Sequence, residues 1–211
     1  MAALVPRDSP GFEIEPIKDL MGFRAAGLGR LKFNDVAVPA ANVVGKPGFA
    51  VSHVAPEGLQ FGRISTACSA LGLLRGCVEE SAEFTATRRA GARQLADLGM
   101  IQSLLARMGA DWEAAQLLCW NACRAHDERR PEMFAQAFTA KYFTSRAAVS
   151  AAANAVQIMG AAGCHESSPV SRFYRGCKIM EIIEGTSQVH ERILAQGYIQ
   201  EATKRQRRRV Q

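Results

Sequence analysis

The sequence predicts a mainly α protein, a bundle of four to five helices preceded by a small β-strand segment. Prolines and glycines are frequent before residue 50, whereas apolar residues recur at helical spacing after about residue 59, within long proline-free stretches. We therefore expect a partial β-domain over residues 1–50, a helical bundle over 51–200 and a basic, disordered tail over 201–211.

Two segments of the first part have the pattern of strands. FEIEPI at 12–17 alternates apolar and polar residues, and GRLKFNDVAVP at 29–39 spaces its apolar residues for one face of a sheet around a polar break. Two or three strands are too few to form a stable sheet alone. We expect these strands to pair with strands from elsewhere.

The helical part is divided by four breaks, which are a polar turn containing Gly91, the charged HDERRPE, the small GAAGCHESSP and the short EGTSQ. The alanine-rich third helix is expected to be central, because small side chains allow helices to approach closely. The expected helices span 59–88, 95–127, 133–159, 169–180 and 189–199.

Composition excludes several classes of protein. The 211 residues are 48% hydrophobic, yet no apolar run is long enough for a membrane span, and the N-terminus lacks the build of a signal peptide, so a cytoplasmic location is expected. The net charge of +6 comes mostly from five residues of the tail. No basic stripe for nucleic acid is visible. The tail is either a solvated end or a weak site for an anionic partner. Its basic residues are Lys204, Arg205, Arg207, Arg208 and Arg209.

The six cysteines indicate neither a metal site nor a disulfide framework. None forms a C-x-x-C pair, and no histidine stands at metal-ligand spacing around them. We expect free thiols, mostly buried.

Glu184 is the carboxylate most suited to chemistry. It follows an apolar stretch, Ile179 to Ile183, and precedes Gly185, so that a substrate could approach it closely beside an apolar wall. From the residues alone, a glutamate that caps a turn is the favoured interpretation.

Five segments, in order along the chain, resemble the acyl-CoA dehydrogenase family. IIEGTSQVHERILA resembles the signature I-Y-E-G-T-S-x-x, and AVQIMGAAG resembles A-V-Q-I-x-G-G-x-G. PVSRFYRGCKIMEI and ALGLLRGCVEESAEFTATRR resemble the segment that leads to the base and the helix that ends in R-x-x-F-G. MGFRAAGLGRLKFNDVAVPAANVVG resembles the end of the family's β-domain. The resemblance covers nearly the whole chain except the basic tail.

The resemblance implies FAD-dependent α,β-dehydrogenation of an acyl thioester carried by CoA or by a carrier protein. Glu184 would remove the α-proton, and the β-hydrogen would leave as hydride to FAD. Some relatives place the base on the helix near Arg63, but the neighbouring residue here is Gly62, which supports Glu184. Arg63 and Gly185 are implied to bind the substrate.

The resemblance also implies flavin contacts, with departures that predict weak FAD binding. Arg88 matches an arginine that approaches the FAD pyrophosphate of a neighbouring subunit, where a guanidinium suits phosphate. The other implied contacts are Gln157, Gly160 and Ala161 near the adenosine end, and Thr186 and Gln188 after the base. The departures are Gly91, Ala92, Gly99, Ala161 and Gly176.

The family's N-terminal helical domain and the first half of its β-domain have no counterpart in this sequence. The chain is then one half of a split enzyme with a complementary N-terminal subunit, a part of a longer protein, or a helical subunit without activity. The resemblance further implies a homodimer or tetramer, for which the alanine-rich helix at 147–155 suits close packing, and an electron-transfer flavoprotein or another acceptor. The alternative function is a non-catalytic assembly subunit.

Overall fold

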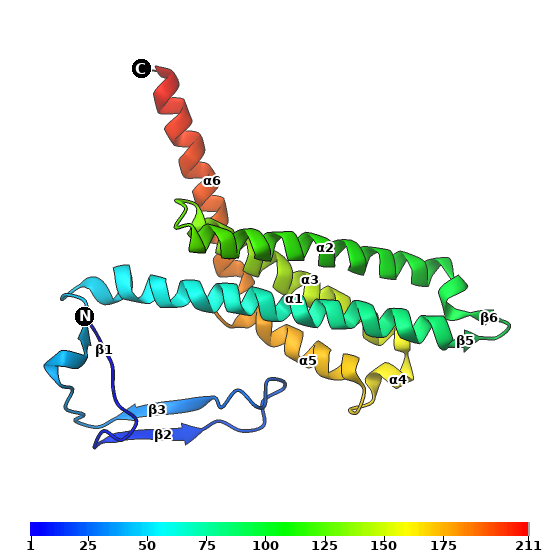
Figure 1. Ribbon diagram of the computed structural model, residues 1–211, viewed down its shortest axis with the longest axis horizontal. Coiled ribbons are helices and arrows are strands. Elements are labelled where there is room, and N and C mark those ends of the chain that lie inside the picture. Colours follow the sequence, from blue (N-terminus) through cyan, green and yellow to red (C-terminus); the bar gives the residue numbers. More distant parts are fainter. Residues whose placement is uncertain (211) are drawn as a thin grey trace. The chain divides into compact units, whose positions relative to one another are not determined.

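The computed structural model describes residues 1–210, which divide into two compact units, one ending at Phe61 and one beginning at Gly62. Helix α1 (Ala55–Thr87) begins in the first unit and continues into the second. The first unit holds short strands, and the second holds the long helices (Figure 1).

The first unit contains two small antiparallel sheets. Strand β1 (Ala2–Ala3) pairs with β4 (Val43–Val44), and β2 (Phe12–Pro16) pairs with β3 (Gly29–Phe33). The rings of Phe12 and Phe33, which are opposite each other in the register, stack at 4.9 Å between centroids. The two expected strands are therefore confirmed, but β3 ends at Phe33 because the chain turns at Asp35, whose φ is 50°. Short helical turns follow, η1 (Ala40–Asn42) and η2 (Ala50–Val54).

The second unit is a helical bundle, as the sequence predicts. The hairpin of β5 (Arg89–Ala90) and β6 (Arg93–Gln94), followed by the turn η3 (Leu95–Asp97), connects α1 to the next helix. The remaining helices are α2 (Gly99–Asp127), α3 (Met133–Met159), the short α4 (Ala161–Cys164), α5 (Pro169–Ile182) and α6 (Ser187–Val210). All breaks fall where the charged, proline-containing or glycine-containing segments predict them.

Helix α3 is the centre of this bundle and contacts α2, α5 and α6. Its alanines are buried, and their small side chains let the neighbouring helices approach closely. Most of the alanine-rich stretch at 147–155 packs inside this bundle, whereas its Ala153 is exposed, so a role of the stretch in self-association stays a prediction. Those buried in this stretch are Ala147, Ala148, Ala151, Ala152 and Ala155.

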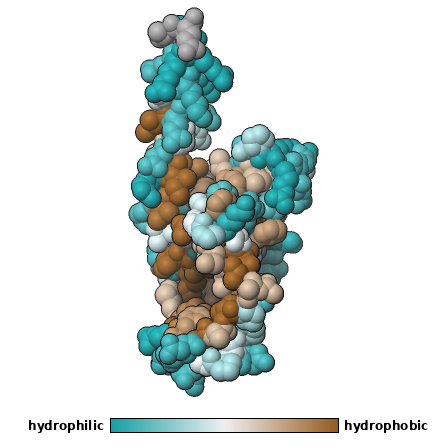
Figure 2. Space-filling model, turned by 90° about the vertical axis from the view of Figure 1, so that its left-hand side faces the viewer, coloured by the Kyte–Doolittle hydropathy of each residue, from teal (hydrophilic) through white to brown (hydrophobic). Residues whose placement is uncertain are grey.

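Helix α6 continues through the basic segment that the sequence predicts to be disordered. Lysine, arginine, glutamine and alanine all favour helix, and a helix that is already nucleated gains one hydrogen bond per added residue. Arginines in the last turn also interact favourably with the helix dipole. The end of α6 is exposed and covered by hydrophilic side chains, which are teal at the top of Figure 2.

The cysteines are free, but fewer are buried than expected. Cys77, Cys119 and Cys177 are buried, whereas Cys68 and Cys164 are exposed. Among residues 1–210, no helix has the length and apolar character that crossing a bilayer requires.

Candidate active site

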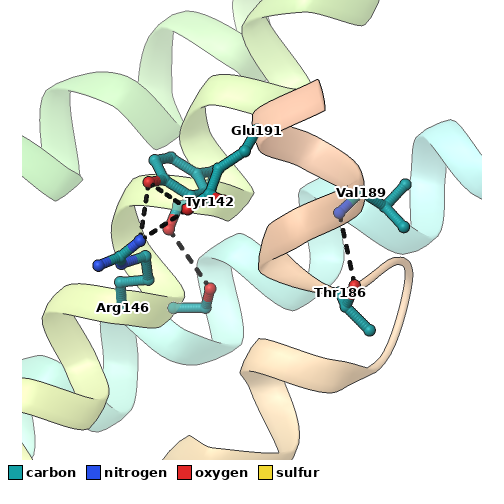
Figure 3. A network of polar contacts seen from close by, with 6 residues as sticks. Tyr142, Arg146, Thr186, Val189 and Glu191 are labelled. Carbon is teal, nitrogen blue, oxygen red and sulfur yellow. Dashed lines mark hydrogen bonds and ion pairs between the residues drawn. The ribbon is translucent and has the colours of Figure 1, made fainter. Parts of the chain in front are cut away.

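Glu184 lies in the sharp turn between α5 and α6. Its φ is 55° and that of Gly185 is 100°, so two successive residues have left-handed backbone. This conformation is unfavourable for a residue with a Cβ, such as glutamate. The turn ends at Thr186, whose hydroxyl Oγ1 accepts a 3.4 Å hydrogen bond from the backbone N–H of Val189 and so caps α6 (Figure 3).

The Glu184 side chain reaches α1 at a position without a side chain. A Cβ added at Gly62 would overlap the carboxyl carbon of Glu184. The Glu184 Oε2 atom is buried and has no hydrogen-bond partner among the residues that the structure describes. The carboxylate thus occupies space that a side chain at position 62 would fill, and its Oε2 atom accepts no hydrogen bond from the described chain.

Arg63 brings a cation next to this carboxylate. Its guanidinium carbon lies 4.3 Å from the centroid of the Phe138 ring, a cation–π contact. Burial lowers the pKa of Arg63, while the charge of Glu184 acts in the opposite direction. The Arg63 Nε atom is buried and has no hydrogen-bond partner within the described chain. The substrate residue predicted from the family and the predicted base therefore lie together.

Two buried side chains hold the backbone of the Glu184 turn. The Lys141 ammonium on α3 donates to the carbonyl oxygens of Glu181 at 3.2 Å and Gly185 at 2.6 Å. His190 Nε2 on α6 lies 3.2 Å from the carbonyl oxygen of Glu184. Both side chains are completely buried.

The environment of His190 favours the neutral imidazole. Burial is the main cause that lowers its pKa to about 4, and the positive charges of Lys141 and Arg63 add to the effect. Because a carbonyl oxygen only accepts, the Nε2–H tautomer donates to Glu184. Phe138 packs edge-on against the imidazole at 5.1 Å between centroids. His190 is therefore a neutral donor to the turn at ordinary pH.

A second polar network joins α3 to α6 outside the Glu184 turn. Tyr142 donates its hydroxyl hydrogen to Glu191 Oε1 at 2.9 Å, and Arg146 donates to both the Tyr142 hydroxyl and Glu191 (Figure 3). The side chains of Arg146 and Glu191 are about half exposed, and Tyr142 is partly buried. The network joins α3 to α6 without contacting the Glu184 turn.

The predicted site residues fall into two separate groups. Glu184, Gly185, Arg63 and Thr186 lie together, with Gln188 exposed on the first turn of α6. The residues of the second group are exposed and lie near the C-terminal ends of α1 and α3, far from Glu184. Along α3 the separation from Lys141 to Gln157 is about 24 Å, at 1.5 Å per residue. The far group consists of Arg88, Gln157, Gly160 and Ala161.

One departure from the family pattern has a structural reason. Gly91 has a φ of +62° and lies with Ala92 in the turn that joins β5 to β6. Such a tight hairpin favours glycine where φ is positive. The glycine at position 91 is therefore favoured by the local backbone.

Sequence reasoning missed Lys141, His190 and Phe138. The signal for Lys141 was a single lysine on the alanine-rich face of the central helix, since a cation at a buried position needs partners. His190 and Phe138 carry no comparable signal, because their roles depend on how α3 and α6 meet.

A family model described as the acyl-CoA dehydrogenase C-terminal domain matches residues 52–199. The chain belongs to the acyl-CoA dehydrogenase family. Its fold is therefore the helical C-terminal domain of these flavin oxidoreductases.

Individual relatives agree with this assignment. The short-chain specific acyl-CoA dehydrogenase of Rattus norvegicus is 34% identical over 194 residues, which are 92% of this chain and 47% of that protein. A glutaryl-CoA dehydrogenase of Desulfococcus multivorans is 32% identical over 90% of this chain and 48% of its own length. The structure of butyryl-CoA dehydrogenase from Megasphaera elsdenii superposes with a TM-score of 0.88 at 32% identity, over 93% of this chain and 51% of that one. The chain thus spans about half the length of the relatives it matches.

Proposed function

We propose that Glu184 is the general base of an FAD-dependent α,β-dehydrogenation of an acyl thioester. The observation that carries the proposal concerns the Glu184 carboxylate, which lies beside Gly62. Its Oε2 atom is buried and has no hydrogen-bond partner in the described chain. A carboxylate whose lone pairs are not used by hydrogen bonds is available to accept a proton. The family membership makes this the expected reaction.

In this reaction the Glu184 carboxylate takes the proton from the α-carbon, and the β-hydrogen leaves as a hydride, so that a trans double bond forms between the two carbons. The exposed side chains of Ile182 and Ile183 precede the base and offer apolar surface to an acyl chain. Arg63 lies beside the carboxylate and binds the substrate in this proposal. The acyl carrier is CoA or a carrier protein.

The residues of this chain suit FAD, which supplies the hydride acceptor when it is bound. Arg88, Gln157 and Gly160 are exposed, and Gly160 has a φ of 59° with open space beside it, so a ligand can approach the backbone there. Thr186 and Gln188 lie next to the base. Because the two groups are far apart, we propose that Arg88 and Gln157 serve the flavin of a neighbouring subunit.

The remaining parts of the proposal concern partners. The strands β2 and β3 form a sheet of only two strands whose Leu31 and Phe33 are about half exposed, which supports completion by strands of a complementary N-terminal part. We propose self-association as a dimer or tetramer and an electron-transfer flavoprotein or other acceptor. The protein acts in the cytoplasm in this proposal.

The test is dehydrogenation measured by dye reduction, with the chain assembled with a complementary N-terminal half. Glu184→Gln keeps the shape and removes the proton acceptor, so turnover falls by roughly 10²–10⁴-fold while the fold remains. Near-wild-type turnover would exclude Glu184 as the base.

Titration with FAD, with and without the complementary half, tests the cofactor separately. We expect weak binding to the chain alone and tight binding to the assembly. Absence of binding in the assembly would instead favour the non-catalytic subunit, which the departures at Gly91, Ala92 and Gly99 also favour.

A further inference from the structure

Lys141, on α3 of the second unit, is a completely buried cation. A buried ammonium is costly unless it is hydrogen-bonded or paired. Its ammonium donates hydrogen bonds to two backbone carbonyl oxygens, those of Glu181 and Gly185. A buried lysine that donates its hydrogen bonds to backbone carbonyl oxygens stabilises a particular backbone conformation.

The two carbonyl groups lie on either side of Glu184 in the sequence. The Glu181 carbonyl belongs to the last turn of α5, where carbonyl groups lack helical partners and a cation interacts favourably with the helix dipole. The Gly185 carbonyl directly follows Glu184. A single ammonium therefore spans the turn that carries the carboxylate.

The turn requires such support. A left-handed φ is unfavourable at a residue other than glycine, and Glu184 has a φ of 55°. Conformations of this kind persist only where surrounding contacts determine them. His190, on α6, also holds the turn through the carbonyl oxygen of Glu184.

We propose that Lys141 is a positioning residue for Glu184, which fixes the direction of the carboxylate by binding the carbonyl oxygens of Glu181 and Gly185. The role of Glu184 as base rests on the proposed function, but the effect of Lys141 on the turn does not. Lys141 is fully buried and acts through the turn, so it needs no contact with the substrate.

The charge state of Lys141 does not limit this role. Burial lowers the pKa of Lys141 to about 8, with Arg63 acting in the same direction and Glu181 and Glu184 in the opposite one, while neutral His190 faces it from α6. A neutral amine still carries two N–H hydrogens, enough for both carbonyl groups. The hydrogen bonds therefore persist above pH 8.

The first experiment measures the accessibility of Glu184 in the chain alone. Carbodiimide coupling to an amine, followed by peptide mass spectrometry, gives the modification rate of Glu184 relative to the exposed Glu113. In Lys141→Met, which keeps the apolar stem and removes the donors, we expect the Glu184 rate to rise several-fold. In Lys141→Gln, with one donor group, we expect an intermediate rate.

The matched control is Tyr142→Phe. It removes a hydrogen bond between the same two helices, α3 and α6, at the adjacent residue, but does not touch the turn. We expect a wild-type rate at Glu184. Wild-type rates in folded Lys141 variants would overturn the proposal. So would a rise in the control, or failure of both Lys141 variants to fold, because Lys141 would then support the bundle as a whole.

The second experiment uses the assembled enzyme. We expect Lys141→Met to lower kcat by about 10- to 100-fold, as small misplacements of catalytic groups do, with KM nearly unchanged. In the Glu184→Gln background, Lys141→Met should lower kcat little further, because its effect on kcat passes through Glu184. Additive losses would overturn the positioning role. If the wild-type assembly is inactive, the proposed function fails while the labelling result still decides the role of Lys141 in the turn.

Discussion

The carboxyl group of Glu184 occupies the space that a side chain at Gly62 would fill. The two residues are separated by more than a hundred positions in the sequence. A glycine on α1 is unfavourable by about 1 kcal/mol relative to alanine. At position 62, however, a larger side chain would overlap the Glu184 carboxyl group and displace it.

Gly62→Ala tests this relationship. Because the Glu184 carboxylate is the flexible end of a side chain, we expect it to move aside while the bundle stays folded. Displacement of the base should lower turnover of the assembled enzyme by about 10²-fold, while the melting temperature changes little. Wild-type turnover would show that the carboxylate does not act from this position.

The control for that variant lies on the same helix. Gly72→Ala adds the same methyl group where nothing lies within 4 Å. Its expected effect is a stabilisation of up to about 1 kcal/mol from helix propensity, with turnover unchanged. If Gly72→Ala also lowers turnover, the loss in Gly62→Ala comes from a general change in α1 and not from displacement of the Glu184 carboxylate.

The buried imidazole of His190 predicts acid sensitivity. Its folded-state pKa is about 4, against 6.5 for an exposed histidine. Between these values the unfolded chain binds a proton that the folded chain does not, so stability falls as pH decreases from 6.5 to 4 and is unaffected above 6.5. Melting temperatures of His190→Gln should decrease less over this window than those of the wild type. Parallel curves for the two proteins would refute the assignment.

Self-association is expected to use an exposed apolar face of α2, since most of the alanines of α3 are buried inside the bundle. Leu117 and Trp120 are 64% and 58% exposed and lie three residues apart on one side of the helix. Trp120→Asp should shift the molar mass in light scattering towards the monomer, whereas Gln116→Asp should not. A wild-type monomer at micromolar concentration would contradict this prediction.

The order of the long helices and the segments that end them could be predicted from the sequence, because apolar periodicity and helix breakers are local signals. Glu184 could be chosen from its neighbours and the family pattern, and a glycine at position 62 cannot supply a base. That the carboxylate lies against Gly62, and that Lys141 and His190 support its turn, could not be foreseen, because these contacts depend on how α1, α3 and α6 approach one another. The helical end of α6 was missed because a charge-rich composition is shared by disordered tails and by solvated helices.

Exchange of the α-proton of an acyl thioester with deuterated water tests the central claim most directly, because it requires the base but no hydride transfer. With the assembled enzyme, we expect deuterium at the α-carbon for the wild type and at least about 10²-fold slower incorporation for Glu184→Gln. Equal rates of incorporation in the two proteins would contradict the assignment of Glu184 as the base.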